Sequence, residues 1–259
     1  MKQTFNFHTH TSRCGHAYGW DEQYVKAAIK AGFQKLGFSD HMGYPGYSMP
    51  KDRMDGDQVF EYLESIEKLK NQYQDQIQIY KGFEIEWYDS QKDYLIDMRK
   101  ACDYMILGQH MKHPYGYGYD YLCDDEDIMM YASQIEAGMA SGLVSYLAHP
   151  DYFMLGRRDF NESCVEASKK ICEASLRYQV PLEINLKGLT KTPGYYEDGK
   201  VSAYPYRRFW EIASSYGCEA VYGFDAHSPA DLLESGRIHR ADEILEGISI
   251  HHLSELTLK

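Results

Sequence analysis

The 259-residue sequence lacks the features that mark membrane proteins and disulfide-stabilised secreted domains. No run of apolar residues approaches the roughly 18 needed to cross a membrane. The six cysteines are scattered without a Cys-x-x-Cys pair, and no apolar segment follows the N-terminal Met-Lys-Gln-Thr. A chain of this length buries a full-sized core without disulfide bonds. We therefore expect a cytoplasmic protein with reduced thiols.

Basic residues are fewer than acidic residues in this sequence. The chain has 27 Lys and Arg against 39 Asp and Glu, which gives a formal net charge of −12. Such a surface repels nucleic acid and anionic membranes, so we expect neither as a partner. An acidic protein can still bind an anionic substrate where metal ions supply local positive charge. The sequence does not specify an oligomeric state.

The chain contains no Ser/Gly/Pro-rich linker, low-complexity tract or internal repeat, so we expect a single domain over residues 1–259. Short β-rich runs alternate with longer segments of helical periodicity, which indicates βα units around a parallel sheet. Seven strands are expected, at residues 4–8, 35–39, 77–84, 104–107, 143–148, 181–184 and 220–224. Helices are expected at about 22–31, 58–73, 90–101, 126–140, 162–178 and 206–216, followed by short helices and a last strand.

Histidines gather at the expected C-terminal ends of these strands. A single His-x-His pair is a weak signal, and any one histidine could simply fill a core or cap a helix. Chance placement would scatter them, whereas the strand ends of a parallel barrel converge on one rim. The residues at these ends are His8, His10, His41, Glu84, His110, His149, Asn185, Asp225 and His227, with His16 in the first loop. We therefore expect their side chains to meet.

Imidazole and carboxylate groups are ligands for zinc, iron and manganese. Seven imidazoles with Glu84 and Asp225 exceed the roughly four to six ligands of one ion, so we expect two to three divalent ions. Two carboxylates do not neutralise these ions, and a hydroxide and a phosphate dianion would balance the remaining charge. Such a site supplies a low-pKa water and ions that clamp the attacking and leaving oxygens of a phosphoester.

The sequence resembles the polymerase-and-histidinol-phosphatase (PHP) superfamily over nearly its whole length. The resemblance is carried by His8-Thr9-His10, His16, Ser39-Asp40-His41, Gly82-Phe83-Glu84, Gly108-Gln109-His110, Ala148-His149-Pro150-Asp151 and Phe224-Asp225-Ala226-His227. The single-domain length, the stretch from Leu182 to Leu189 and the later Tyr204-Pro205 are similar to the histidinol-phosphatase branch. The resemblance implies an α/β fold, a distorted (β/α)7 TIM-like barrel, with a trinuclear metal centre.

The resemblance also implies how the ligands are shared. His8, His10, Glu84 and Asp225 would hold one ion. Glu84 would bridge to a second ion held by His110 and His149, and a third would be held by His16, His41 and His227. The implied reaction is hydrolysis of L-histidinol phosphate to L-histidinol and phosphate in histidine biosynthesis. A metal-bridging hydroxide would attack phosphorus, with Glu84, Asp225 and His227 as catalytic residues.

Substrate contacts are predicted from basic residues near the motifs. The Arg157/Arg158 and Arg207/Arg208 pairs are candidates for a bidentate phosphate clamp, with solvated surface charge as an equal alternative. The stretch 185–191 lacks the arginine of the family pattern, so Lys187 and Lys191 would contact phosphate as point charges.

The proton for the leaving alkoxide could come from Asp225, a metal-bound water or His113. Tyrosine-rich loops at 44–57, 112–125 and 187–204 would wall the pocket, unless these side chains pack only within their loops.

Three residues beside the motifs are expected to support the site rather than to bind metal. Cys14 is expected to be a small side chain that fills space among the histidines. Asp40 should point away from the metals and anchor its surroundings. Glu86 lies on the same strand face as Glu84 and could support the ligands from behind.

Three other functions remain open. The same chemistry could act on a sugar or nucleotide phosphate or on a phosphotyrosine peptide. An amidohydrolase-type metal hydrolase would also begin with His-x-His, but no expected strand ends on the modified lysine that such enzymes use as a bridge. A non-catalytic metal-binding domain is disfavoured by the full ligand set.

Overall fold

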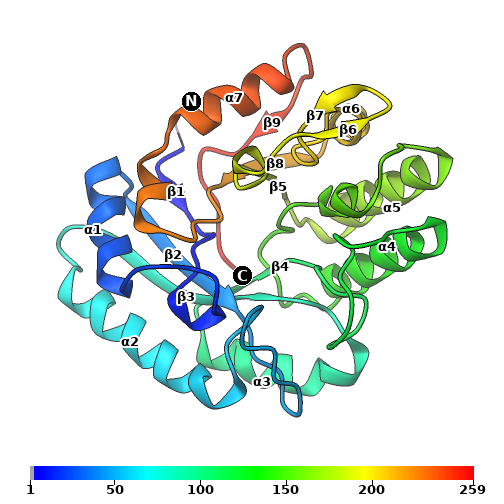
Figure 1. The fold of residues 1–259 in the computed structure, drawn as a ribbon. Coiled ribbons are helices and arrows are strands. Elements are labelled where there is room, and N and C mark those ends of the chain that lie inside the picture. The colour runs from blue at the N-terminus through cyan, green and yellow to red at the C-terminus, as the bar shows by residue number, and fades with distance from the viewer. Residues whose placement is uncertain (1–2) are drawn as a thin grey trace.

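The computed structural model describes residues 3–259, whose strands form a ring surrounded by helices (Figure 1). One sheet is parallel, in the order β1 (Phe5–Asn6), β2 (Lys35–His41), β3 (Gln78–Ile85) and β4 (Tyr104–Leu107). A second parallel sheet contains β5 (Leu182–Asn185), β8 (Glu219–Gly223) and β9 (His251–His252). The predicted parallel sheet is therefore present, divided into two arcs.

Single bridges join the two arcs into a distorted barrel. Leu147 pairs in parallel with Leu107 at the end of β4 and with Leu182 at the start of β5, and Thr9 pairs with Ala226 after β8. The prediction of a full strand at 143–148 is wrong, because only Leu147 pairs on both sides. This segment nevertheless occupies the fifth of seven positions around the ring, between β4 and β5.

Seven α-helices lie on the outside of the ring (Figure 1). The first six match the predicted segments to within about two residues, and α7 and β9 match the expected tail. They are α1 (Asp21–Ala31), α2 (Val59–Gln72), α3 (Lys92–Ala101), α4 (Asp125–Ala140), α5 (Glu162–Tyr178), α6 (Arg207–Tyr216) and α7 (Gly236–Ile244). Short 3-10 turns cover Ser12–Cys14, Gly56–Gln58, Asp89–Gln91, Tyr152–Gly156, Gly188–Thr190 and Pro229–Leu233.

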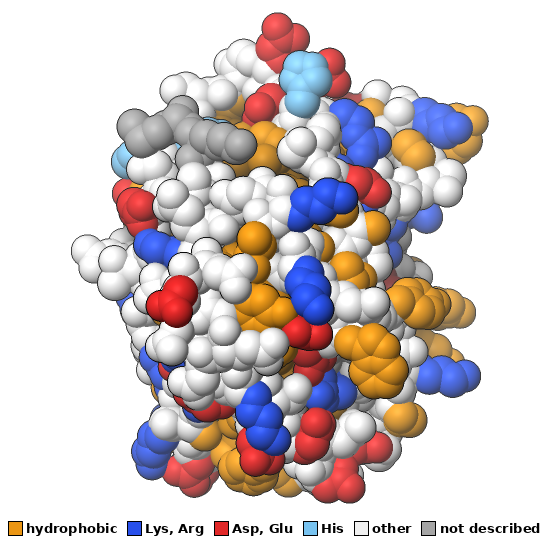
Figure 2. Space-filling model, turned by 90° about the vertical axis from the view of Figure 1, so that its left-hand side faces the viewer, with side chains coloured by type: hydrophobic (Ala, Val, Ile, Leu, Met, Phe, Trp, Pro, Cys, Tyr) orange, Lys and Arg blue, Asp and Glu red, His pale blue; other side chains and the backbone are white. Residues whose placement is uncertain are grey.

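Helix α2 shows how the helices cover the sheet with an apolar stripe. In α2 the stripe is Val59, Tyr62, Leu63, Ile66 and Leu69, all buried. This spacing of three and four residues places the side chains on one face of the helix. Within residues 3–259, no helix is both long enough and apolar enough to cross a membrane. Acidic and basic side chains are interspersed over the face shown in Figure 2.

An antiparallel hairpin was missed in the predicted loop at 187–204. It pairs β6 (Gly194–Tyr196) with β7 (Gly199–Val201). The turn is Glu197-Asp198, and Gly199, the first residue of β7, has a φ of 99°, which glycine adopts without strain. An Asp-Gly pair between short β-rich runs is a recognisable hairpin signal.

The barrel interior holds an apolar cluster of its own. It consists of the buried residues Phe5, Phe7, Tyr104, Ile106, Tyr146, Ala148 and Val221. Strands β1, β4 and β8 are not all neighbours, so their side chains meet only inside the ring. Leu253, Leu256 and Leu258 pack against this cluster, and the C-terminus lies at the centre of the ring in Figure 1.

We predict that the C-terminal leucines contribute to global stability. Leu256→Ala and Leu258→Ala should each lower the free energy of unfolding by about 1–2 kcal/mol, because both side chains are partly buried and a fully buried leucine loses about 2–5. Urea unfolding measures the change. Thr257→Ala, exposed between them, is the control and should change it by less than about 0.5 kcal/mol. Equal effects of all three variants would contradict this packing role.

Candidate metal centre

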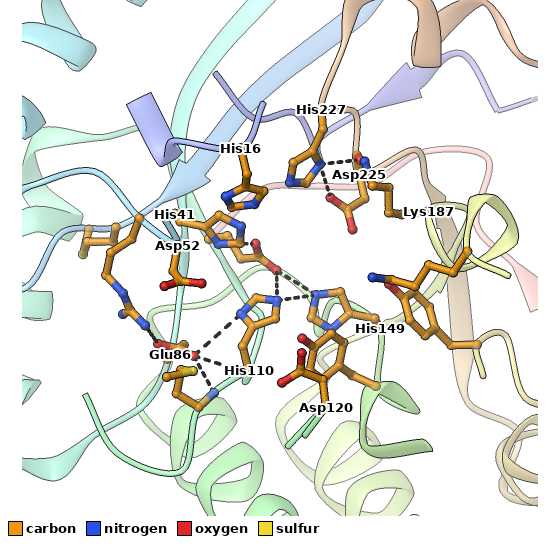
Figure 3. Close-up of a pocket in the computed structure, with 17 residues that line it drawn as sticks. His16, His41, Asp52, Glu86, His110, Asp120, His149, Lys187, Asp225 and His227 are labelled. Carbon is orange, nitrogen blue, oxygen red and sulfur yellow. Dashed lines mark hydrogen bonds and ion pairs between the residues drawn. The ribbon is translucent and has the colours of Figure 1, made fainter. Parts of the chain in front are cut away.

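The nine predicted ligands lie together at the C-terminal end of the barrel strands. Figure 3 shows His16, His41, His110, His149, Asp225 and His227 around one pocket. The remaining three ligands, His8, His10 and Glu84, lie within ion-pair distance of members of this set. The strand ends therefore bring together residues that are spread over 220 positions of sequence (from His8 to His227).

The Glu84 carboxylate lies at the centre of this cluster. Its Oε1 lies 2.9 Å from His149 Nε2, 3.4 Å from His8 Nε2 and 3.6 Å from His110 Nε2. Its Oε2 lies 3.0 Å from His41 Nδ1 and 3.5 Å from His10 Nε2. Five imidazoles from four segments thus surround one carboxylate.

Glycine makes room for this carboxylate. Gly108 follows β4, and a Cβ atom on it would overlap the Oε1 atom of Glu84. Gly223, at the end of β8, has the same relation to the Oε2 atom of Glu183. Any larger residue at either position would displace a buried acid of the site.

Asp225 forms a second contact centre. Its Oδ1 lies 3.1 Å from His10 Nε2, 3.2 Å from His227 Nδ1 and 3.6 Å from His8 Nε2. Asp225 has a φ of 47° and His149 a φ of 28°, both in the left-handed region that is unfavourable for non-glycine residues. Such strain, of order 1–3 kcal/mol each, persists where the surrounding structure fixes the backbone, as it often does at functional sites.

Potential ligand atoms fall into compact groups. The ligand atoms within each group lie within 4.8 Å of one another. The groups His8/His10/Asp225 and His16/His41/His227 each lie within one ligand set that the resemblance implies, whereas His8/Glu84/His149 and His10/His41/Glu84 combine residues from different sets. His110 lies beside His149, with 3.1 Å between their Nε2 atoms.

Cys14 also lies close to His10 and His227. Its Sγ donates a hydrogen bond to the Thr11 carbonyl oxygen at 3.2 Å. Burial, with the Asp40 carboxylate next, raises the pKa of the thiol far above its usual value. A protonated, hydrogen-bonded thiol is a poor ligand, in agreement with its expected role as a filler.

Four buried atoms of the cluster test whether it fits a metal. His8 Nε2, His10 Nε2, Glu84 Oε2 and Asp225 Oδ1 have no hydrogen-bond partner in the structure. His10 Nε2 lies 3.1 Å from Asp225 Oδ1 and 3.5 Å from Glu84 Oε2, and His8 Nε2 lies 3.6 Å from Asp225 Oδ1, all without hydrogen-bonding geometry. Buried polar atoms normally have a partner, because leaving one unsatisfied costs about 1–3 kcal/mol. Two imidazole nitrogens and two carboxylate oxygens are the donor set of a divalent transition metal, so these residues fit one.

The other nitrogen of several imidazoles is fixed by an acceptor behind the cluster. His8 Nδ1 contacts Glu183 Oε2 at 2.9 Å, and His10 Nδ1 contacts Asp40 Oδ1 at 3.4 Å. His16 Nδ1 contacts the Cys14 carbonyl oxygen, and His227 Nδ1 contacts that of Asp225, both at 3.0 Å. Acceptors at Nδ1 orient the ring and leave Nε2 for a metal.

The sequence interpretation missed the role of Glu183. The residue is fully buried on β5, two positions before Asn185, whose Nδ2 donates to Glu183 Oε1 at 2.6 Å and to Asp225 Oδ2 at 3.1 Å. The period of two along a strand places Glu183 and Asn185 on one face. An acid on the inward face of a strand beside the ligands was the available signal.

Glu86 supports His110 from behind, as expected. Its Oε1 accepts hydrogen bonds from the backbone N–H groups of His110 at 3.0 Å and Met111 at 2.7 Å. Its Oε2 forms an ion pair with Arg53 Nη2 at 2.6 Å. Burial raises the pKa of Glu86, but Arg53 and His110 outweigh burial and lower the pKa to about 2. The carboxylate is therefore ionised and fixes the loop that carries His110.

The two acids of the cluster are ionised as well. Burial raises the pKa of Glu84, but the imidazoles of His8 and His110 outweigh it and bring the pKa well below its usual value. His8 and His227 lower the pKa of Asp225 against burial in the same way. Ionised carboxylates are the form that binds a metal ion.

The imidazoles divide into two kinds. Burial, followed by the charge of His227, lowers the pKa of His10, and burial followed by His10 lowers that of His41. These rings are neutral, as metal ligands must be. Burial also lowers the pKa of His8, but Glu183 and the cluster acids outweigh it and raise the pKa well above its usual value.

A cavity of about 370 Å³ opens above the cluster. Lys187 and Lys191 line it on the β5 side, and Asp52 and Asp120 line it from the loops after β2 and β4. Tyr152 and Tyr204 add aromatic walls, although only Tyr204 belongs to the predicted tyrosine-rich loops. The cavity therefore combines metal ligands, amines, carboxylates and rings.

Five residues predicted to contact the substrate lie outside this cavity, among them Arg208, which pairs with Glu197. Arg157 bonds to Asp125 and Asp159. Arg158 bonds to the Leu155 carbonyl oxygen, and Arg207 to that of Ile244. His113 lines a separate surface pocket. Proximity in sequence to a ligand was misleading here, because the 3-10 turn Tyr152–Gly156 carries the chain away from the rim before Arg157.

Known proteins resemble this chain over most of its length. The chain is 25% identical to the "Probable histidinol-phosphatase" of Deinococcus radiodurans, over 87% of this chain and 86% of that protein. It is 24% identical to the protein of the same name from Schizosaccharomyces pombe, over 86% of this chain and 80% of that protein.

A solved structure has the same fold. It is the histidinol phosphate phosphatase of Lactococcus lactis in complex with zinc, L-histidinol and phosphate, with a TM-score of 0.72 and 18% identity. The match covers 98% of this chain and 99% of that one. The family model of the PHP domain matches residues 6–187, more than half of the sequence. The chain therefore belongs to the PHP domain family.

Proposed function

We propose that this chain is a metal-dependent phosphomonoesterase that hydrolyses L-histidinol phosphate to L-histidinol and phosphate. The observation that carries the proposal is the convergence of four buried ligand atoms without hydrogen-bond partners beneath a cavity lined by two lysines. The similarity to proteins named histidinol-phosphatase, and to one solved with zinc, L-histidinol and phosphate, supports the choice of substrate.

The ligand assignment is part of the proposal. Two to three divalent ions, of zinc, iron or manganese, would be held by the nine residues His8, His10, His16, His41, Glu84, His110, His149, Asp225 and His227. Bound ions of this kind supply Lewis-acid polarisation of a phosphoryl oxygen and a water of lowered pKa.

The chain's own side chains bind and orient the substrate. Lys187 and Lys191 attract the phosphate charge, in place of the arginines that lie outside the cavity. Of the two side chains predicted to protonate the leaving alkoxide, Asp225 lines the cavity and His113 does not. Asp225 and a metal-bound water therefore stay the candidates for the group that delivers that proton. Glu84 and His227 hold their neighbours in the geometry that the reaction requires.

We also propose that residues 1–259 act as one functional unit. The family match ends at residue 187, yet Asp225 and His227 lie beyond it and contact His8 and His10 directly. A role in histidine biosynthesis would follow from the proposed substrate, and a cytoplasmic location stays a prediction from the sequence.

The activity itself is the first test. Protein loaded with zinc, and separately with manganese or iron, should release phosphate from L-histidinol phosphate faster than from a sugar phosphate, a nucleotide or a phosphotyrosine peptide. Chelation should abolish turnover and metal addition should restore it. No turnover of any member by metal-loaded protein would contradict the phosphatase proposal, and turnover of the others alone would contradict the substrate.

Removal of a ligand should remove metal and activity together. We expect His10→Ala and Asp225→Ala each to lower kcat/KM by at least about 100-fold and to reduce bound metal, because each deletes an atom of the central cluster. Elemental analysis and phosphate release measure the two effects. A variant that keeps the wild-type rate would contradict its assignment.

The acid behind His8 offers a test of metal positioning. Glu183→Gln should lower metal affinity by about 10- to 100-fold, because it preserves shape but removes the charge that orients His8. Competition with a chelating dye measures the affinity. Glu246→Gln, on the exposed surface, serves as the matched control and should bind metal as the wild type does. Unchanged affinity in Glu183→Gln would show that the contact is not needed.

A further inference from the structure

The cavity above the metal ligands carries opposite charges on opposite sides. Asp52 follows β2, and Lys187 follows β5, which lies across the ring from β2. Figure 3 shows Asp52 and Lys187 on opposite sides of the histidine cluster, with Asp120 on a third side near His149. The carboxylates of Asp52 and Asp120, both exposed, have no hydrogen-bond or ion-pair partner among residues 3–259, whereas those of the other acids that line the cavity, Glu84, Glu86 and Asp225, are paired.

A buried tyrosine side chain also lines this cavity. Tyr204 lines the cavity with only 2% of its surface exposed, and its hydroxyl has no hydrogen-bond partner within the described part of the chain. Its ring lies 5.9 Å from that of Tyr152, which packs edge-on against His110 at 4.9 Å. Asp120 and Tyr152 line the same cavity, and Figure 3 shows Asp120 near His149, whose ring lies 5.0 Å from that of Tyr152, so Asp120 lies near this aromatic wall.

These features describe a site for a cation next to aromatic rings. A carboxylate and the faces of tyrosine rings both attract an alkylammonium group. A neutral alcohol would leave the two carboxylates without a partner when it displaces their water, which disfavours its binding. Lys187 and Lys191 attract the anionic end of the same molecule on the other side.

We propose that Asp52 and Asp120 bind the ammonium group of the substrate and thereby select phosphomonoesters of amino alcohols over those of neutral alcohols. The proposal rests on the phosphomonoesterase function proposed above, and it names the residues that recognise the leaving group of the substrate. Asp120, near Tyr152, makes the larger contribution to binding the ammonium group. Asp52, in the loop after β2, adds to the negative electrostatic potential of the cavity.

The test compares two substrates that differ only in the amine. They are L-histidinol phosphate and 3-(imidazol-4-yl)propyl phosphate, assayed with the metal-loaded wild type and with Asp120→Asn and Asp52→Asn. The ratio of the two kcat/KM values reports recognition of the amine. We expect this ratio to fall by about 10-fold or more in Asp120→Asn, through a higher KM for the amine substrate alone, as loss of a charged hydrogen bond predicts.

A matched control comes from the loop that carries Asp52. Asp57 is exposed, lies outside the cavity and should leave the ratio unchanged when it is replaced in Asp57→Asn. An unchanged ratio in both Asp120→Asn and Asp52→Asn would overturn the proposal. An equal loss for both substrates would also overturn it, because it would indicate a structural role.

A binding measurement separates this inference from the proposed function. Calorimetric titration of the metal-loaded protein with L-histidinol, and with 4-(3-hydroxypropyl)imidazole, needs no turnover. Tighter binding of L-histidinol by the wild type, lost in Asp120→Asn, would support the inference. Equal binding of both compounds by the wild type would overturn it. Failure to hydrolyse any phosphomonoester would count only against the proposed function.

Discussion

Burial of the ionised Glu84 carboxylate is the constraint on which the site depends. A buried charge without compensation is far too costly for a marginally stable fold. Here five imidazoles surround it, at 2.9–3.6 Å, and they come from the segments after β1 and β4, from the end of β2 and from the segment before β5. The strand ends must therefore converge, and Gly108 must lack a side chain. The cluster is also strongly polar, which leaves it suited to cations.

The apolar side chains that stabilise the barrel and the polar side chains of the site lie at different levels along the barrel axis. Phe7, Tyr104 and the C-terminal leucines fill the interior below, while polar atoms occupy the rim. Between them, Glu183 and Asp40 fix the imidazoles from behind, and Arg53 holds Glu86. His149 and Asp225, which have unfavourable backbone angles, are held by other bonds: Tyr131 donates to the His149 carbonyl oxygen, and Asn185 donates to Asp225 Oδ2.

Much of this arrangement follows from sequence alone. Periodicity predicted the six main helices and most strands, and the placement of histidines at strand ends predicted which residues meet. The segment at 143–148 was harder, because pairing through Leu147 alone depends on tertiary contacts. Arg157 was predicted to contact the substrate, but the 3-10 turn Tyr152–Gly156 carries the chain away from the rim before it. Glu183 was missed because its role depends on His8, which lies on a distant segment of the sequence. Direction and distance between elements are the information that local patterns lack.

The closure between the ends of the chain has a consequence for folding. Ala226 pairs with Thr9, and Phe224 N–H donates to Asn6 Oδ1 across 218 positions of sequence. Contacts of such long range form late and slow the folding of a domain. His8, His10 and Asp225 straddle this same seam. A metal ion that binds all three would stabilise only the closed ring, by mass action, so metal supply would govern the fraction of molecules in which the barrel is closed.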